Sequence, residues 1–310
     1  AGRMGLNPRT GTSRDGHPLS LSRTPPGDLA RFVARFFLLI IERPDDSLIE
    51  SFLLHEAAYI RVPVIGRWET QVAGRWTPYE GPMVFGAQRR RFPVRCTGPI
   101  VAAGFMLRPA AWFAFSDVPA HQVADRLDPI DGAWGEALRW AREDIYQIER
   151  TFDRLEQVVR VRIAERRVTI DPALERFEAI SRLDPTRPVA DIARALGMIP
   201  RRLDRHVRAH FGHPPKTVLR RSRFLDMAAV LRGLSAAGDG EQAALRFYDA
   251  SHLNREFRLF LDMPPNRFRN TPTLLFTPGL EVREQRKLAE AAADGQALAW
   301  SPPGIPRAAE

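Results

Sequence analysis

The sequence has very little cysteine, with Cys96 as the single thiol among 310 residues. One cysteine cannot form an internal disulfide, and it also excludes a zinc cluster built on several cysteines. Long apolar runs are missing as well, because the most apolar stretch, residues 32–41, is too short to cross a bilayer and contains Arg35. The first thirty residues are polar and rich in Pro and Gly, unlike a signal peptide. We therefore expect a cytoplasmic protein without a membrane partner.

Histidines are scarce in the first half of the chain, which removes the usual metal sites. His55-Glu56 begins an HExxH motif, but Tyr59 stands where the second histidine ligand is needed. A metal-binding cupin needs paired histidines and a carboxylate, yet His55 is the only His between residues 18 and 120. No Ser-His-Asp or phosphate-loop spacing occurs either. We expect no enzyme, no metal and no other cofactor.

The positive charge is concentrated in one segment. The chain carries a net charge of +9, and residues 181–270 hold 17 Lys or Arg against 9 Asp or Glu, which places +8 of that charge there. A basic segment beside a nearly neutral remainder is typical of nucleic-acid binding. An Arg-rich solvated surface is the alternative, but it does not explain the localisation.

Two helix-turn-helix patterns follow one another in this basic segment. The first has a short helix at 189–197 that ends at Gly197, and a second helix at 199–212 that begins at Pro200. Leu203 and Val207 lie at helical spacing, and arginines share the opposite face. The pattern returns fifty residues later, where Leu253, Arg255, Arg258, Pro264 and Pro265 repeat Leu203, Arg205, Arg208, Pro214 and Pro215. Residues 217–234 have the period of one long helix joining the two units.

This stretch resembles the DNA-binding domain of the AraC family of bacterial transcription regulators. The resemblance covers residues 188–269, and its two-unit spacing is more specific than a single helix-turn-helix. The residues that carry it are Ile192, Ala193, Gly197, Leu203, Arg205, Gly212, Pro214, Pro215, Arg223, Phe224, Phe247, Tyr248, Asp249, His252, Leu253, Arg255, Glu256, Phe257, Pro264 and Pro265. The second unit departs from the family pattern at Gln242, Arg246 and Ala250.

The resemblance implies contacts with double-stranded DNA, and with RNA polymerase if the protein is an activator. The expected base contacts are Arg201, Asp204 and Arg205 in the first unit and Ser251, His252, Asn254 and Arg255 in the second. Asp204 can instead orient Arg208, four residues further on. The expected phosphate contacts, which position the protein without reading sequence, are Arg202, Arg208, Lys216, Arg220 and Arg258.

Closely spaced strand patterns fill residues 52–107 and favour a small β-barrel or sandwich. Residues 28–135 resemble the β-rich, cupin-like N-terminal domain found ahead of AraC-type modules, which senses a small-molecule effector, forms a homodimer, or does both. Its aromatic residues are either an effector pocket or plain core, and the pocket candidates are Trp68, Trp76, Phe85, Phe105 and Trp112. Helical periods follow at 133–167, 171–183 and 281–293, with Asp171 as an expected N-cap.

The sequence therefore predicts an α+β protein, with an N-terminal β-barrel or sandwich and a C-terminal all-α part of two helix-turn-helix units. The expected parts are a disordered leader (1–26), a β-rich sensor or dimerisation domain (27–135), a helical linker (136–186), a DNA-binding domain (187–270) and a flexible tail (271–310). The alternative is a ligand-responsive protein-interaction module whose degenerate helices no longer read DNA.

Overall fold

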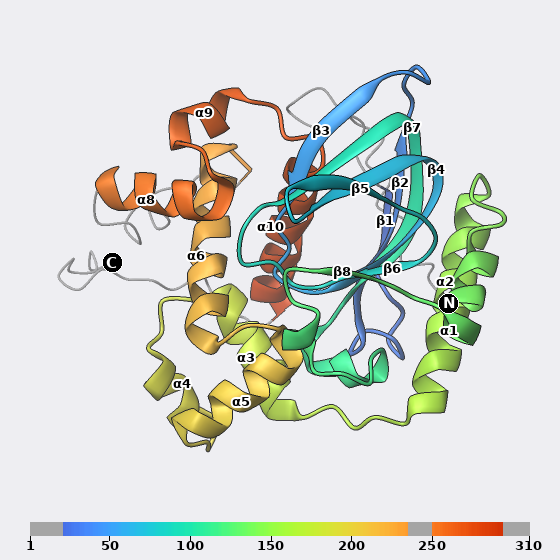
Figure 1. The fold of residues 1–310 in the computed structure, drawn as a ribbon. Helices are drawn as coiled ribbons and strands as arrows, with labels where there is room; N and C mark the ends of the chain where they lie inside the picture. Colours follow the sequence, from blue (N-terminus) through green and yellow to red (C-terminus); the bar gives the residue numbers. More distant parts are fainter. Residues whose placement is uncertain (1–20, 235–249, 294–310) are drawn as a thin grey trace, which may run out of the picture.

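A computed structural model describes residues 21–234 and 250–293. One antiparallel sheet of eight strands forms the N-terminal part, and helices form the C-terminal part (Figure 1), as the sequence predicts. The sheet order is β1-β2-β7-β4-β6-β8, with β3 paired to β7 and β5 to β4. The bounds are β1 Leu21–Arg23, β2 Val33–Ile41, β3 Leu48–Leu53, β4 Tyr59–Val72, β5 Arg75–Tyr79, β6 Met83–Phe85, β7 Phe92–Leu107 and β8 Leu127–Pro129.

The two long strands β4 and β7 pair along most of their length and bend the sheet. The register between them shifts at Pro63/Ile65 and again at Ile65/Arg67. Gly66 sits at this bend with φ +90, and a Cβ there would lie 2.6 Å from the Pro99 carbonyl oxygen, so only glycine fits. Beyond the bend β7 changes its second partner from β2 to β3. The strands consequently curl around an inner face.

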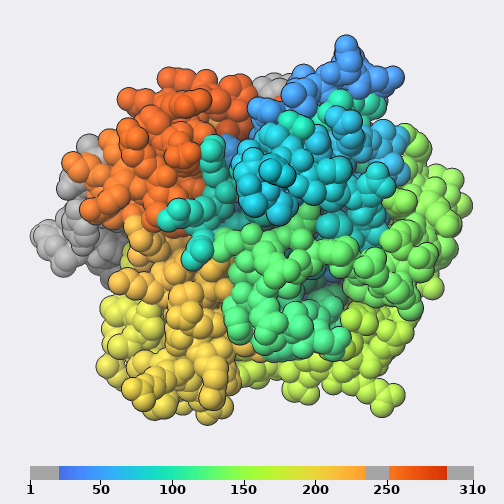
Figure 2. Space-filling view, viewed as in Figure 1, coloured from blue at the N-terminus to red at the C-terminus, as the bar shows by residue number. Residues whose placement is uncertain are grey.

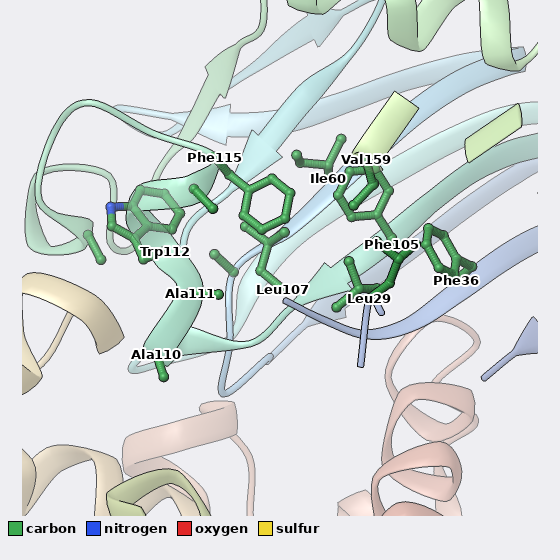
Figure 3. Packing of buried hydrophobic residues seen from close by; sticks show 14 of the residues in the cluster. Leu29, Phe36, Ile60, Phe105, Leu107, Ala110, Ala111, Trp112, Phe115 and Val159 are labelled. Atoms are coloured by element: carbon green, nitrogen blue, oxygen red, sulfur yellow. The ribbon is translucent and has the colours of Figure 1, made fainter. Parts of the chain in front are cut away.

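Side chains on β2 alternate between two separate cores. Phe36 and Leu38 belong to the outer core, together with Ile60, Phe105 and residues of the 3-10 helix η1 (Pro109–Ala114). Figure 3 shows Phe36 beside Phe105 in this cluster. Phe37, Leu39 and Ile41 point to the inner face, against Tyr59, Trp68 and Phe85. This alternation is the period of two that a strand with both faces buried requires.

The helices following the sheet are α1 (Gly132–Ala141), α2 (Ile148–Arg166) and α3 (Pro172–Leu183). The helical period expected at 133–167 is confirmed but divided, because the chain leaves the helix between α1 and α2. The Thr151 hydroxyl in α2 donates to the carbonyl of Asp144 in this connection at 2.8 Å. The N-cap at Asp171 is confirmed, since its carboxylate accepts from the Ala173 amide at 2.9 Å.

The remaining helices are α4 (Val189–Ala195), α5 (Pro200–Phe211), α6 (Pro215–Leu231), α8 (Ala250–Leu261), α9 (Pro265–Asn270) and α10 (Phe276–Ala293). The long connecting helix expected at 217–234 is confirmed as α6. Figure 2 shows residues 180–230 (yellow) and 250–270 (orange) directly against the segment around 85–130 (teal and green). One hydrophobic core continues from the sheet into α3, α5 and the start of α6.

The segment expected as a flexible tail contains a packed helix. Figure 1 shows α10 between the sheet and α6. Leu280 on α10 is 2 % exposed and packs with Phe224 and Phe268. Arg283 and Lys287 both donate to the buried carboxylate of Asp226 on α6, at 2.8 and 2.9 Å. The Pro- and Ala-rich composition concealed this buried face, so the expectation of flexibility is wrong for residues 276–293.

We expect Leu280→Ala to lower the free energy of unfolding by about 2–5 kcal/mol, because it leaves a cavity in a packed cluster. Leu288→Ala is the matched control on the same helix, where the side chain is 39 % exposed, and it should cost less than about 0.5 kcal/mol. Urea denaturation of both variants measures the difference. Equal, small effects would mean that α10 does not pack against α6.

Candidate nucleic-acid interface

Helices α4 and α5 form the first helix-turn-helix unit, and local sequence sets their ends. Gly197 follows α4 with φ +65, the left-handed conformation expected from the sequence. Pro200 opens α5 at a position where the missing amide hydrogen costs nothing. Leu203, Val207 and Phe211 form the buried side of α5. The opposite side is exposed and carries Arg201, Arg202, Arg205 and Arg208.

The exposed side of α5 holds one internal ion pair. Arg208 donates to Asp204 at 2.6 Å, one helical turn away. This is the contact that the sequence offers as the alternative role of Asp204. Within residues 21–234 and 250–293, no ion pair engages Arg201, Arg202 or Arg205. Three guanidinium groups therefore remain available on one helix face.

The second unit is described from α8 onward. Ser251, Asn254, Arg255 and Arg258 are exposed on α8, while Phe257 and Phe260 are buried and pack on Phe224 of α6. His252 is half-buried and its Nε2 lies 3.6 Å from Glu256. The departures at Gln242 and Arg246 lie outside the described residues, and Ala250 is the first residue of α8.

Arg220 on α6 is engaged by an ion pair within the helical module, with its side chain 41 % exposed. Its guanidinium donates to both carboxylate oxygens of Glu256 on α8, at 2.9 Å from Nε and 2.5 Å from Nη2. Glu256 is 2 % exposed, so this pair ties α6 to α8 inside the module. Arg220 therefore has a structural contact besides the expected phosphate contact, because a buried carboxylate requires a charged partner. Lys216, the other candidate on α6, is exposed.

Polar contacts that the sequence did not reveal attach the first unit to the sheet region. His210 packs edge-on against Phe113, with ring centroids 4.9 Å apart. The His213 ring lies between two partners, with Nε2 3.1 Å from Asp125 and Nδ1 3.4 Å from Arg221. Arg221 is fully buried and donates to the backbone carbonyls of Gln88 and Glu56, at 2.6 and 2.7 Å. The available signal was an arginine on the apolar side of α6, beside Val218 and Leu225.

The five aromatic residues expected at an effector pocket do not surround one cavity. Trp68 and Phe85 belong to the inner core, Phe105 and Trp112 to the outer core. Trp76 lies under the guanidinium of Arg95, at 4.7 Å. Of these five, Trp112 alone lines one of the described cavities, a small one beside α5. The structure therefore favours the alternative, plain core, for Trp68, Phe85, Phe105 and Trp112.

The comparisons with known proteins agree with the helical geometry. Residues 179–271 match a family described as a helix-turn-helix domain. The matched range contains α4 and α5 of the first unit and α8 of the second. A match to a helix-turn-helix domain supports DNA binding by this region. No curated protein matches the sequence.

Several solved structures are similar to this chain over much of its length. Unsaturated fatty acid-bound wild-type ToxT from Vibrio cholerae strain SCE256 is 12% identical, covering 78% of this chain and 97% of that chain, with a TM-score of 0.44. ToxT from Vibrio cholerae O395 is 12% identical over 76% of this chain and 97% of its own, with a TM-score of 0.42. The AraC-like transcriptional activator CuxR is 14% identical over 70% of this chain and 83% of its own, with a TM-score of 0.32.

Two further observations concern the described part of the chain. None of its groups of His, Cys, Asp and Glu has three or more members placed to hold a metal ion. Among the same residues, no helix is both long enough and apolar enough to span a bilayer.

The buried His213 should make stability depend on pH. Burial lowers the pKa of His213 below its ordinary 6.5, although Asp125 opposes the shift. The unfolded chain therefore binds a proton more readily than the folded one, and stability is lost as pH falls below about 6.5. In urea denaturation between pH 7.5 and 5, His213→Gln should reduce the slope of unfolding free energy against pH by up to about 1.4 kcal/mol per pH unit.

The matched control is His121→Gln, which changes an exposed histidine on η2 (Ala120–Gln122). It should keep the wild-type slope. If His213→Gln also keeps that slope, His213 does not titrate differently in the folded and unfolded states.

Proposed function

We propose that this protein is a sequence-specific AraC-type regulator that inserts α5 and α8 into successive major grooves of DNA. The observation that carries the proposal is the exposed cationic side of α5, opposite its buried side of Leu203, Val207 and Phe211. A helix of this kind that follows a short helix and a glycine turn suits major-groove reading. Helix α8 has the same two-sided form, with Arg255 and Arg258 exposed and Phe257 buried.

Base reading is assigned to side chains near the start of each helix. Arg201 and Arg205 suit guanine, where a guanidinium can donate to both O6 and N7. In the second unit the base contacts are Ser251, His252, Asn254 and Arg255. Asp204 orients Arg208, and this role is supported by their 2.6 Å contact. The phosphate contacts are Arg202, Arg208, Lys216 and Arg258, while Arg220 sets the position of α8 through Glu256.

A small-molecule effector acts, in this proposal, through the β-rich region of residues 27–135. Two features support communication between that region and the DNA-binding domain of residues 187–270. The outer core of the sheet continues into α5 and α6. Arg221 on α6 donates to two backbone carbonyls of the sheet region. A change in the sheet region therefore alters the support of the helix that joins the two reading helices.

DNA affinity should fall steeply with salt if the module docks on phosphates. We expect a slope of log Kobs against log salt of roughly −5 to −8, from about that many phosphate contacts. Gel-shift titrations against DNA from upstream of the coding sequence, between 50 and 300 mM salt, measure it. Absence of binding, or a flat salt response, would favour the protein-interaction alternative.

Arg205 and Arg255 should differ in what they contribute. Arg205→Ala should lose about 1–3 kcal/mol of preference at one half-element while it retains non-specific binding. Arg255 belongs to the unit that departs from the family pattern, so Arg255→Ala should weaken all sequences alike and make the salt slope shallower by about one. Competition binding against a library of half-element variants separates the two effects.

Arg75→Ala is the charge-matched control, because Arg75 is exposed on β5 and outside the helical module. It should leave both affinity and preference unchanged. A larger loss of preference in Arg255→Ala than in Arg205→Ala would reverse the assignment of the two units.

A further inference from the structure

A cavity of about 30 Å³ lies between the inner face of the sheet and the start of α10. Its polar wall comes from Arg35 on β2, His55, and Tyr59 and Arg61 on β4. The opposite wall is the segment from Leu274 to Gly279. None of the described residues lining this cavity is an Asp or a Glu. Two arginines therefore face one small space that contains no carboxylate.

Arg61 is the more deeply buried of the two arginines, at 5 % exposure. Its guanidinium carbon lies 4.7 Å from the ring centre of Trp68 and 5.3 Å from those of Tyr59 and Phe85. The aromatic faces attract the cation but accept no conventional hydrogen bond from it, and Nε and Nη1 have no partner. Buried charges in proteins are ordinarily paired, so this one lacks an anion.

Two residues near Arg61, Tyr59 and Arg35, would also gain a hydrogen-bond partner from a bound anion. The Tyr59 hydroxyl is buried and has no hydrogen-bond partner. Burial, together with the charges of Arg286 and Arg61, lowers the pKa of Arg35 to about 10. Arg35 makes one hydrogen bond, at 3.2 Å, to the Ser22 hydroxyl. A bound carboxylate would satisfy both guanidinium groups and the hydroxyl.

A second cavity of about 30 Å³ adjoins the first and is mostly apolar. The two share Arg35, His55, Met106 and Gly279. The second extends between β2, the loop after β3, α6 and α10, where its apolar walls are Leu54, Leu225, Phe276 and Leu280. Its charged lining residues include Glu56, Arg283 and Arg286, and the Glu56 carboxylate already accepts from Arg283 at 3.1 Å. Each cavity has room for about two water molecules. The pair therefore matches a charged head joined to a short apolar body.

We propose that these two cavities bind a short aliphatic monocarboxylate, with its carboxylate held by Arg35, Arg61 and the Tyr59 hydroxyl. The hydrocarbon part lies along Met106 toward Leu280. The residues around the carboxylate do not select the length of the ligand's hydrocarbon chain. That length is limited by the space beneath α10.

Residues next to this cavity also contact α6, the helix that joins the two helix-turn-helix units. His55 lines both cavities, and its backbone amide donates to the Gln88 side chain at 2.7 Å. The next residue, Glu56, accepts from Arg221 through its backbone and from Arg283 through its carboxylate, at 2.7 and 3.1 Å. A ligand that displaces His55 therefore also moves Glu56, whose backbone carbonyl accepts from Arg221 of α6. This regulatory part rests on the proposed function, whereas the binding site does not.

The test is calorimetric titration of the full chain with sodium butyrate, with 1-butanol as the neutral analogue and sodium chloride as the ionic control. Butyrate should bind in this titration and raise the Tm measured by thermal denaturation, whereas butanol and chloride at equal concentration should do neither. Octanoate should bind more weakly than butyrate because it exceeds the space. If butyrate does not bind, or butanol or chloride binds equally well, the proposal is wrong, and tighter binding of octanoate would contradict the size limit.

Arg61→Met should weaken butyrate binding about tenfold or more, since it removes a charged hydrogen-bond donor. Without ligand its Tm should equal or exceed that of the wild type, because an unpaired buried charge is removed. A lower Tm in Arg61→Met together with unchanged butyrate affinity would identify Arg61 as a structural cation among the aromatic rings. Arg67→Met is the control, on the same strand with a side chain that is 68 % exposed, and it should keep full affinity.

Gly279→Ala tests the cavity without changing any charge. The added methyl group would lie 3.2 Å from His55 Cε1, inside the shared space. It should also weaken butyrate binding, and unchanged affinity in this variant would place the ligand elsewhere. DNA affinity is then measured with and without butyrate. Butyrate binding to a protein that binds no DNA would refute the proposed function and leave the ligand site standing.

Discussion

The need to satisfy a buried guanidinium at Arg221 is the constraint on which the arrangement of the two halves depends. Arg221 is fully buried, and burial lowers its pKa to about 10. Its hydrogen bonds go to backbone carbonyls of the sheet region, at Gln88 and Glu56. A lost hydrogen bond to a charged group costs about 1.5–3 kcal/mol, so α6 cannot slide over the sheet without a penalty.

That fixed helix in turn positions α5 and α8, the two helices proposed to read DNA. At its N-terminal end, α6 follows α5 through the turn at Gly212, where a Cβ would lie 3.1 Å from Ala124 of the sheet region. Further along, Arg220 holds Glu256 of α8. Helix α10 supports the same helix from the other side through Asp226. The spacing of the two units is thus a property of the whole molecule.

Charged side chains are exposed in one part of this protein and form buried ion pairs in another. On α5, Arg201 and Arg205 are exposed. Inside, Glu178 is 3 % exposed and accepts from Arg182 and Arg286, each at 2.8 Å. Burial alone would raise the pKa of Glu178, but these arginines and Arg108 lower it to about 2, so the cluster is ionised. The net charge of residues 181–270 therefore overstates the number of cations on its surface, because Arg182 and Arg221 are buried.

The sequence by itself determined the helical units, because caps, turns and apolar period are local. Gly197, Pro200 and the spacing of Leu203 and Val207 predict α4 and α5 without reference to the rest of the chain. Tertiary structure alone decided the pairing of Arg220 with Glu256, the packing of α10, and the meeting of Arg35, Arg61 and Gly279. Those contacts join residues tens to hundreds of positions apart, and no local period encodes which buried partner a charged side chain finds.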